Sequence, residues 1–288
     1  MNLKKISAAL LSCVMAGTLF TGCGGGDNKT VRDDPQTQIG LISKLNASEE
    51  ELNNRLKKLE EVANRPNMKF SHDYHYYDGI NSLVMAIKAD QVEEVSTYES
   101  VANYLVSKNI EFKILDHTVN MSDSFCCAVR KEDTALLDSI NSAIQSMKDD
   151  GTLDNLTKTY ITDLNLKENP PAVKIEQIDG ADTIKVGITG DLPPLDLILP
   201  DGTPAGFNTA MLAEIGKRIN KNIEIVQIES NARAVALTSK KIDLVFWVTI
   251  PGEFWKGTET PNDIDKPAEL ETTMPYFEDK IVHVTDNN

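Results

Sequence analysis

Histidines and carboxylates gather in the segment HDYHYYD, which covers residues 72–78. Imidazole and carboxylate groups are common zinc ligands, so a tetrahedral metal site is the first chemistry to consider. On a strand, however, neighbouring side chains point to opposite faces. His72 and Asp78 then share one face, whereas Asp73 and His75 share the other. Because these four side chains do not converge, we expect a pocket wall or a solvated edge here, and no metal site.

Three carboxylates could act as a general acid or base in a cleft, namely Asp78, Glu99 and Asp191. That role requires a pKa shifted by the surroundings of the group. No carboxylate pair and no nucleophile–base spacing singles any of them out. We therefore expect no catalytic role for these carboxylates, and no cofactor. A periplasmic dehydratase or lyase acting on a ring acid is the enzymatic alternative.

These residues must be positioned by short apolar strands that alternate with amphipathic helices, a pattern typical of a parallel α/β sheet. The clearest helix carries Phe207, Met211, Ile215 and Ile219 on one stripe and follows a hairpin with Asp-Gly at its turn. Asp133 is placed to cap another helix. The expected strands are 39–43, 92–99, 111–117, 124–133, 184–188, 223–228, 242–248 and 280–284; the expected helices are 48–64, 79–90, 100–109, 134–150, 153–161, 207–219 and 231–241.

Between two of these helical and strand segments, residues 162–182 carry two adjacent prolines, many charges and no sustained period. This stretch is predicted to be a connector.

The cysteine pattern adds a second constraint, because only Cys126 and Cys127 lie beyond residue 23. Neighbours on a strand face opposite ways, so two separately packed thiols are expected rather than a disulfide. Stability must then come from hydrophobic cores, which a chain of this length ordinarily divides between two domains.

The first residues have the pattern of an export signal, since Lys4 and Lys5 precede an apolar run from Ile6 to Phe20. The run is too short to cross a bilayer, and no later segment approaches the roughly 20 apolar residues that a span needs. LFTGC resembles a bacterial lipobox, in which Cys23 would be lipidated after removal of residues 1–22. Residues 24–37 would then be a flexible tether. The alternative is an ordinary secretory signal with an incidental cysteine.

The charge of the chain argues against nucleic acid as a partner. Removing the signal with its two lysines changes the formal net charge from −15 to −17. Nucleic-acid binding depends on clustered Lys and Arg that neutralise phosphates, which an acidic surface does not provide. The charge does not restrict a small ligand.

The segment IKVGITGDLPPLDLILPDGTPAGFNTAMLAEIGKRI resembles the start of an extracytoplasmic solute-binding protein of the amino-acid type, the receptor of ABC importers. LTSKKIDLVFW and MPYFEDKIVHV resemble later parts of the same family's first lobe. AVRKEDTALLDSINSAIQSMKDDGTLDNLTKTYI is similar to the strand and helices that normally end such a protein. The resemblance implies a two-lobed α/β fold of the periplasmic-binding-protein type II class.

The order of these segments is rotated relative to the family. The chain starts with the family's second lobe, at residues 38–120, and residues 121–288 supply the carboxyl-terminal helices, the connector and then the amino-terminal lobe. The sequence therefore looks circularly permuted. Permutation requires that the old ends be joined, for which the connector is available, and that the new ends fall at an exposed crossing between lobes.

The resemblance implies that a small solute binds in the cleft between the lobes, over the carboxyl ends of the strands, and that closure about hinges traps it. The loop residues after the strands become the candidate ligand contacts. They are Asp191, Leu195, Arg233, Trp247 and Thr249 in the later lobe, with Val248 beside them, and Asn46, Ser48, Asp78, Tyr98, Glu99 and Ser100 in the earlier lobe.

Several of these positions depart from the family pattern. The family places an arginine after Thr249 for the ligand carboxylate, and TIPGEFWKGTE contains none. Arg233 could take its place or could reach solvent. Tyr98 stands where the family has an aspartate for the ligand amino group, and Leu195 stands where it has an aromatic ring. Trp247 could stack on a ligand or belong to a core.

The resemblance also implies the partners and the location. We expect a monomeric receptor that is extracytoplasmic, is held at the cell membrane by its lipid anchor, and delivers an amino acid or related small organic ion to an ABC transporter permease. A lipoprotein that binds a ligand to signal, or that binds a protein partner without serving a transporter, is the non-enzymatic alternative.

Overall fold

The computed structural model describes residues 36–43, 71–115, 121–251 and 268–286, together with residues 45, 50, 52–54, 56–57 and 60. The signal, Cys23, residues 24–35 of the predicted tether and the ligand candidates Asn46 and Ser48 lie outside the described residues. The last tether residue, Thr37, belongs to strand β1 and not to a flexible segment. Most of the expected helix 48–64 does so too. No helix in the described part of the chain is both long and apolar enough to span a membrane. The elements below belong to one compact unit, Pro35–Asn288.

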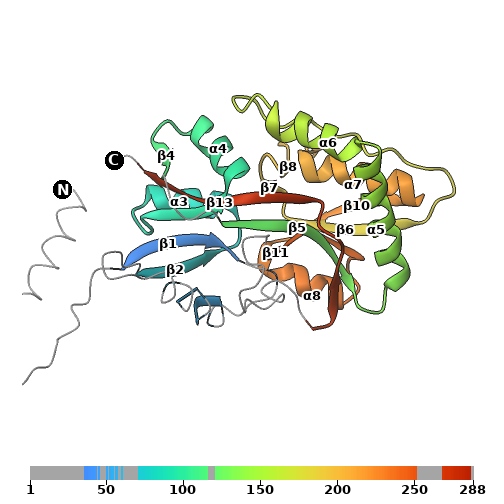
Figure 1. The fold of residues 1–288 in the computed structure, drawn as a ribbon, viewed down its shortest axis with the longest axis horizontal. Helices are drawn as coiled ribbons and strands as arrows, with labels where there is room; N and C mark the ends of the chain where they lie inside the picture. The colour runs from blue at the N-terminus through green and yellow to red at the C-terminus, as the bar shows by residue number, and fades with distance from the viewer. Residues whose placement is uncertain are drawn as a thin grey trace, which may run out of the picture. The chain divides into compact units, whose positions relative to one another are not determined.

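One mixed sheet of ten strands organises this unit, in the order β10-β6-β11-β5-β13-β3-β1-β2, with β12 beside β5 and β4 beside β13 (Figure 1). Two sets of parallel strands lie within it: β2-β1-β3, named here the β1 group, and β10-β6-β11, named the β6 group. The strands are β1 (Thr37–Ile42), β2 (His72–Tyr77), β3 (Glu94–Tyr98), β4 (Phe112–Ile114), β5 (Met121–Arg130), β6 (Thr183–Ile188), β10 (Asn222–Gln227), β11 (Leu244–Pro251), β12 (Leu270–Thr272) and β13 (Phe277–Asp286).

Two helices pack against the β1 group, α3 (Ile80–Lys88) and α4 (Glu99–Lys108). Each turns one apolar side inward, with Leu83 and Ile87 buried on α3, and Val101 buried on α4. This is the 3.6-residue spacing of an amphipathic helix. The chain enters α3 directly from β2 and enters α4 directly from β3, so both helix starts lie at the carboxyl edge of these parallel strands.

The β6 group carries α5 (Thr134–Asp149), α6 (Thr152–Thr157), α7 (Phe207–Ile219) and α8 (Arg233–Thr238). The π-helix η1 (Lys158–Thr162) follows α6, and the 3₁₀-helix η2 (Ser230–Ala232) precedes α8. The predicted stripe of α7 is confirmed, because Phe207, Met211 and Ile215 are fully buried. A small three-stranded sheet precedes α7 and contains the predicted hairpin, with its turn at Asp201 and Gly202. Its strands are β7 (Asp191–Leu192), β8 (Asp196–Ile198) and β9 (Pro204–Ala205).

The two long strands β5 and β13 join the two groups and run antiparallel to each other through the middle of the sheet (Figure 1). The later part of β5 pairs with β11 and β12, whereas the later part of β13 pairs with β3 and β4. The prediction for Cys126 and Cys127 is confirmed, because both thiols are free and buried on opposite sides of β5. Each fills space in a different apolar cluster.

The prediction that Asp133 caps helix α5 is wrong in its chemistry. Asp133 does occupy the position before the first helical residue, but its side chain makes no capping hydrogen bond. Its carboxylate oxygen Oδ2 instead lies 2.7 Å from Nη2 of Arg130. An ion pair with a nearly buried guanidinium therefore takes the carboxylate away from the helix N–H groups.

Of the predicted connector 162–182, residues 163–182 contain no helix or strand, whereas Thr162 is the last residue of the π-helix η1 (Lys158–Thr162). The amino end of β1 and the carboxyl end of β13 both lie beside the amino end of β3. The backbone N–H of Glu93 donates to the carbonyl of Gln38 at 2.8 Å, and the hydroxyl of Thr285 donates to the carbonyl of Glu93 at 2.9 Å. Strands β1 and β13 thus flank β3, and the two ends of the described chain lie at the same edge of the sheet.

Candidate functional site

The carboxyl ends of the β6 group bring together polar residues from three separate segments. Thr189 and Gly190 follow β6, Ser230 and Arg233 follow β10, and Trp247 lies within β11. The carboxyl edge of parallel strands is where ligands bind in α/β proteins of this construction. The candidate site is therefore built outward from this edge.

Trp247 adopts an unusual backbone conformation, with φ +47°, at a bulge in the pairing of β11 with β5. A positive φ is strained for a residue with a large side chain, and such strain is often found at functional sites. The bulge lets the carbonyl of Trp247 accept a hydrogen bond of 2.5 Å from Nη1 of Arg233. The guanidinium also lies over the indole ring, with its central carbon 4.4 Å from the ring centroid.

Arg233 is completely buried, so the alternative that it reaches solvent is wrong. Its Nε donates to the carbonyl of Ser230 at 3.3 Å, its Nη1 donates to the carbonyl of Trp247, and its guanidinium lies over the indole ring. Burial of a guanidinium is tolerated because these acceptors and the ring replace water. Trp247 itself is buried and packs near Phe125, with ring centroids 6.0 Å apart.

A buried carboxylate lies on the other side of Trp247. The indole N–H donates to the hydroxyl of Thr189 at 3.3 Å, and that hydroxyl donates to Asp196 at 3.0 Å. Asp196 also accepts from the backbone N–H groups of Gly190 and Leu192. Burial, together with the nearby Asp191 carboxylate, raises the pKa of Asp196 to about 7, although these donors and Arg233 favour the charged form.

Asp191 links the β6 group to the β1 group. Its Oδ2 accepts a hydrogen bond of 3.1 Å from the backbone N–H of Ile80, the first residue of α3. A helix amino terminus attracts a carboxylate through its free N–H groups and its dipole. A side chain at Gly79 would collide with this carboxylate, since its Cβ would lie 2.0 Å from Oδ2. Burial raises the pKa of Asp191 to about 6, although the Ile80 N–H and Arg233 favour the charged form.

Tyr98 makes a second bridge between the two groups, from the end of β3. Its hydroxyl lies 3.3 Å from Oγ1 of Thr249 on β11 and 3.2 Å from Oδ2 of Asp123 on β5. The ring packs edge-on against Phe125, with centroids 4.7 Å apart. Tyr98 and Thr249 are both buried.

The start of α4 lies next to this bridge. The backbone N–H of Ser100 donates to Oδ2 of Asp279 on β13 at 3.2 Å. Burial raises the pKa of Asp279 to about 6; the hydrogen bond from the Ser100 N–H opposes the shift, whereas the Glu99 carboxylate adds to it. The hydroxyl of Ser100 is buried and has no hydrogen-bond partner among the described residues. Glu99 is more open and lies 3.9 Å from the ammonium of Lys280.

The structure thus brings together Asp191, Arg233, Trp247, Thr249 and Tyr98 through the contacts above. Leu195 is fully buried in the turn before β8, and its carbonyl accepts from Asn208 at 2.7 Å. Asp78 is half-buried in the loop that leads through Gly79 into α3. Val248 is buried in the cluster that contains Cys126, away from the Trp247 side of the strand.

Sequence reasoning missed four residues that organise the site: Thr189, Asp196, Asp123 and Asp279. The sequence could have pointed to Asp196, because its carboxylate follows LPPL in an apolar strand and a buried carboxylate requires hydrogen-bond partners. Asp123 and Asp279 carried none. They reach the site because β5 and β13 pair antiparallel in the register Asp279 to Asp123, a long-range relation that spacing along the chain does not report.

The histidines of HDYHYYD lie on opposite faces, as predicted. Nδ1 of His72 lies 2.7 Å from Oε1 of Glu60, whereas Nε2 of His75 lies 2.6 Å from Oε1 of Gln38. Among the described residues, no group of three or more His, Cys, Asp or Glu side chains is arranged to hold a metal ion.

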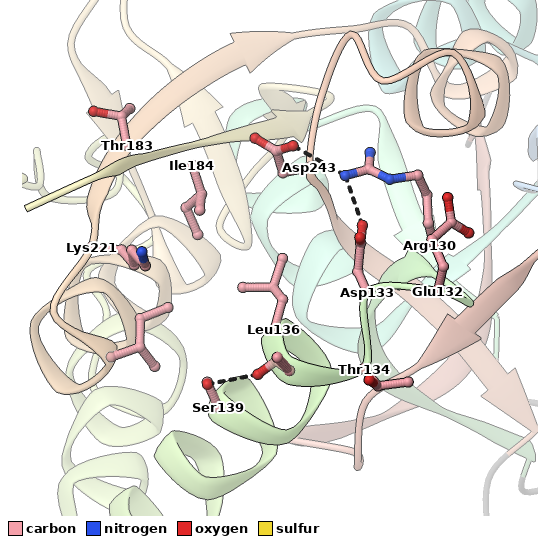
Figure 2. Close-up of a pocket in the computed structure, with 12 residues that line it drawn as sticks. Arg130, Glu132, Asp133, Thr134, Leu136, Ser139, Thr183, Ile184, Lys221 and Asp243 are labelled. Atoms are coloured by element: carbon pink, nitrogen blue, oxygen red, sulfur yellow. Dashed lines mark hydrogen bonds and ion pairs between the residues drawn. The ribbon is translucent and has the colours of Figure 1, made fainter.

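A pocket of about 540 Å³ lies at the opposite, amino edge of the β6 group (Figure 2). Figure 2 shows Leu136 and Ser139 of α5 facing Ile184 at the start of β6. Its charged wall is an ion-pair network in which Nη2 of Arg130 lies 2.7 Å from Asp133 and 3.1 Å from Asp243. The Arg130 guanidinium is thus held by two carboxylates, and none of the predicted ligand contacts lines this pocket. The cluster at the carboxyl edge is therefore the candidate site.

Comparison with known proteins gives one family match. The family of bacterial extracellular solute-binding proteins, family 3, matches residues 50–163 and 184–251, more than half of the chain. No curated protein matches the chain.

Two solved structures are among those to which the chain is similar. The ligand-binding component of an ABC-type import system from Staphylococcus aureus, with zinc bound, has 11% identity and a TM-score of 0.46; the alignment covers 88% of this chain and 67% of that chain. The GluR0 ligand-binding core from Nostoc punctiforme, in complex with L-glutamate, has 11% identity and a TM-score of 0.37, with 88% of this chain and 85% of that chain covered.

Proposed function

Because the chain belongs to the bacterial extracellular solute-binding proteins, family 3, we propose that it is the membrane-anchored receptor of an ABC importer. In this proposal it binds an amino acid or a related small organic ion and presents it to the permease as a monomer. Lipidation of Cys23 would hold it at the outer face of the cell membrane or in the periplasm. Family membership confirms the coarser expectation, a two-lobed α/β solute-binding protein.

We assign the lobes from the two groups of parallel strands. The β1 group with α3 and α4 forms one lobe, which corresponds to the expected lobe 38–120, and the β6 group with its helices forms the other. The strands β5 and β13 pass from one lobe to the other and serve as the hinge. Two antiparallel strands that connect separate lobes can bend while their hydrogen bonds persist.

We also propose that the chain is a circular permutant of the family's usual order. Three observations support this. Gln38 and Thr285 both bond to Glu93, so the ends of the described chain lie close enough to have been joined. The connector supplies the join at the former ends. The two ranges that match the family leave out residues 164–183, which nearly coincide with the connector.

The meeting of the two lobes at Asp191, Tyr98 and Thr249 is the observation that carries the binding proposal. Polar groups from segments far apart in sequence converge there, at the carboxyl edge of both sets of strands. The proposed ligand contacts remain the eleven candidates, of which Asn46 and Ser48 lie outside the described residues: Asn46, Ser48, Asp78, Tyr98, Glu99, Ser100, Asp191, Leu195, Arg233, Trp247 and Thr249.

The proposal is tested by thermal unfolding of the purified protein with a panel of single amino acids and small organic acids. A solute that binds only the folded protein should raise Tm by about 5 °C at a hundredfold excess over its Kd. Thr249→Val should reduce that shift, whereas Thr238→Val, at an exposed position on α8, should not. Chemical conversion of the solute during incubation would instead support the enzymatic alternative.

A further inference from the structure

The connector bonds to both lobes within a few residues, a feature that the binding proposal does not use. On one side, the backbone N–H of Val173 donates to the carbonyl of Pro204 at 2.8 Å, and the N–H of Gly206 donates to Pro171 at 3.3 Å. Val173 also packs against Ala210 and Ala213 of α7. Residues 171–173 are thereby fixed to the β6 lobe.

The preceding residues of the connector bond instead to α4 of the β1 lobe. The hydroxyl of Tyr104 donates to Oδ1 of Asn169 at 3.0 Å. The hydroxyl of Ser107 lies 2.7 Å from the carbonyl of Leu166 and 2.7 Å from the carbonyl of Tyr104 in its own helix, so it can donate to the connector. The ammonium of Lys108 donates to the carbonyl of Lys167 at 2.7 Å. Three donors on neighbouring turns of one helix therefore hold residues 166–169.

Because Asn169 and Pro171 are separated by one residue, the lobes cannot separate without breaking the bonds on one side. The chain has little slack over so short a distance, since one residue spans at most about 3.6 Å. The α4 side carries three hydrogen bonds at the protein surface. The α7 side adds buried apolar contact, so the α4 side is the one that should open.

A second contact, at α3, also holds the two lobes together. The carboxylate of Asp191, from the β6 lobe, holds the first N–H of that helix in the β1 lobe. Helix α3 is thus bonded to Asp191 of the β6 lobe at the edge of the cleft, and helix α4 is bonded to the connector outside the cleft.

We propose that residues 166–169 of the connector form a latch that keeps the two lobes closed when no ligand is bound. This inference rests on the proposed two-lobed function. In a binding protein without such a latch, closure depends on a ligand that touches both lobes. Here part of that interaction is built into the chain, and a solute enters only when the latch opens.

The latch is tested by measuring the distance between spin labels on the full-length protein in detergent. Labels on cysteines introduced at Ser82 on α3 and Ser142 on α5 report the separation of the lobes; both positions are exposed. We expect one short distance in the ligand-free protein. In the double variant Ser107→Ala, Asn169→Ala, we expect the open-to-closed ratio to rise about tenfold, with a second, longer distance.

Two further measurements complete the experiment. The association rate of a solute that raises Tm should increase in the double variant by the same factor as the open population. The matched control is Ser139→Ala, because the Ser139 hydroxyl bonds within its own helix, and it should change neither quantity. The Tm of each variant shows that it is folded.

The outcomes separate the latch from the binding proposal. Widely separated labels in the ligand-free protein, or an unchanged distance in the double variant, would overturn the latch and leave solute binding intact. Closed labels together with a panel of solutes that never shifts Tm would contradict the proposed function while the latch stands.

Discussion

The unusual chemistry of this protein lies in three carboxyl groups of the site, of which Asp196 and Asp279 are buried and Asp191 is half-buried. Burial raises the pKa of Asp196 to about 7 and the pKa values of Asp191 and Asp279 to about 6. In an unfolded chain the same groups would titrate near pH 4. Between the pKa values of the unfolded chain and those of the folded protein, the folded protein binds more protons than the unfolded chain. These groups therefore favour the folded state at low pH, and their contribution is lost as pH rises through 6 to 7.

We expect Asp196→Asn to remove much of this dependence. In the unmodified protein, the contribution of Asp196 to the free energy of unfolding should fall by about 1–3 kcal/mol between pH 5 and pH 8. Urea unfolding at both pH values measures the difference. Asp201→Asn, in the exposed hairpin turn, is the control, because the bonds to Thr203 lower the pKa of Asp201 and its effect has the opposite sign. An equal pH slope in both variants would refute the assignment.

The identities of the site residues were only partly predictable from sequence. Arg233 and Trp247 could be named because each follows or ends a strand, but their direct contact could not. It depends on the bulge at Trp247, where a positive φ turns the carbonyl toward Arg233. Backbone strain of this kind is imposed by tertiary packing and leaves no periodic signal in the chain.

At the scale of elements, the sequence was most informative where one face of a helix or strand is buried. Three predictions of this kind are confirmed. An apolar stripe of α7 is buried, Cys126 and Cys127 face opposite sides of β5, and residues 163–182 contain no helix or strand. The pairing of β5 with β13 was not predicted in register, and neither were the carboxylates that this pairing delivers. Local periodicity identifies the element, whereas register depends on contacts between distant segments.

The junction between β2 and α3 provides a test at this scale. Gly79 has an extended backbone that other residues could adopt, with φ −163°, so its need for glycine comes from the Asp191 carboxylate alone. We expect Gly79→Ala to cost about 1–3 kcal/mol in the free energy of unfolding, because the carboxylate must withdraw from the N–H of Ile80. Chemical denaturation of the purified variant measures the change.

A double variant separates this explanation from a general intolerance of alanine. Adding Asp191→Ala removes the group with which the new methyl collides, so Gly79→Ala should cost much less in that background. Additive costs for the two substitutions would contradict the proposed collision. Ser82→Ala, at an exposed position on α3, is the control for the helix itself.

For the whole molecule, the permuted order can be tested by restoring the family's usual order. The chain would be joined from Asp286 to Gln36 by a short glycine-rich linker and reopened in the connector after Lys174. We expect the rearranged protein to fold and to have a Tm within about 5 °C of the original, since only exposed connections change. Circular dichroism during heating measures this. A rearranged chain that does not fold would count against permutation.

The flanking of β3 by β1 and β13 also determines how the molecule would respond to mechanical load. Both outer strands leave β3 at the same edge, near Glu93. A force that pulls the two ends apart would peel the outer strands from β3 one hydrogen bond at a time, rather than shear many bonds at once. We therefore expect β1 and the carboxyl end of β13 to detach from β3 at low force, before the β6 lobe is stretched.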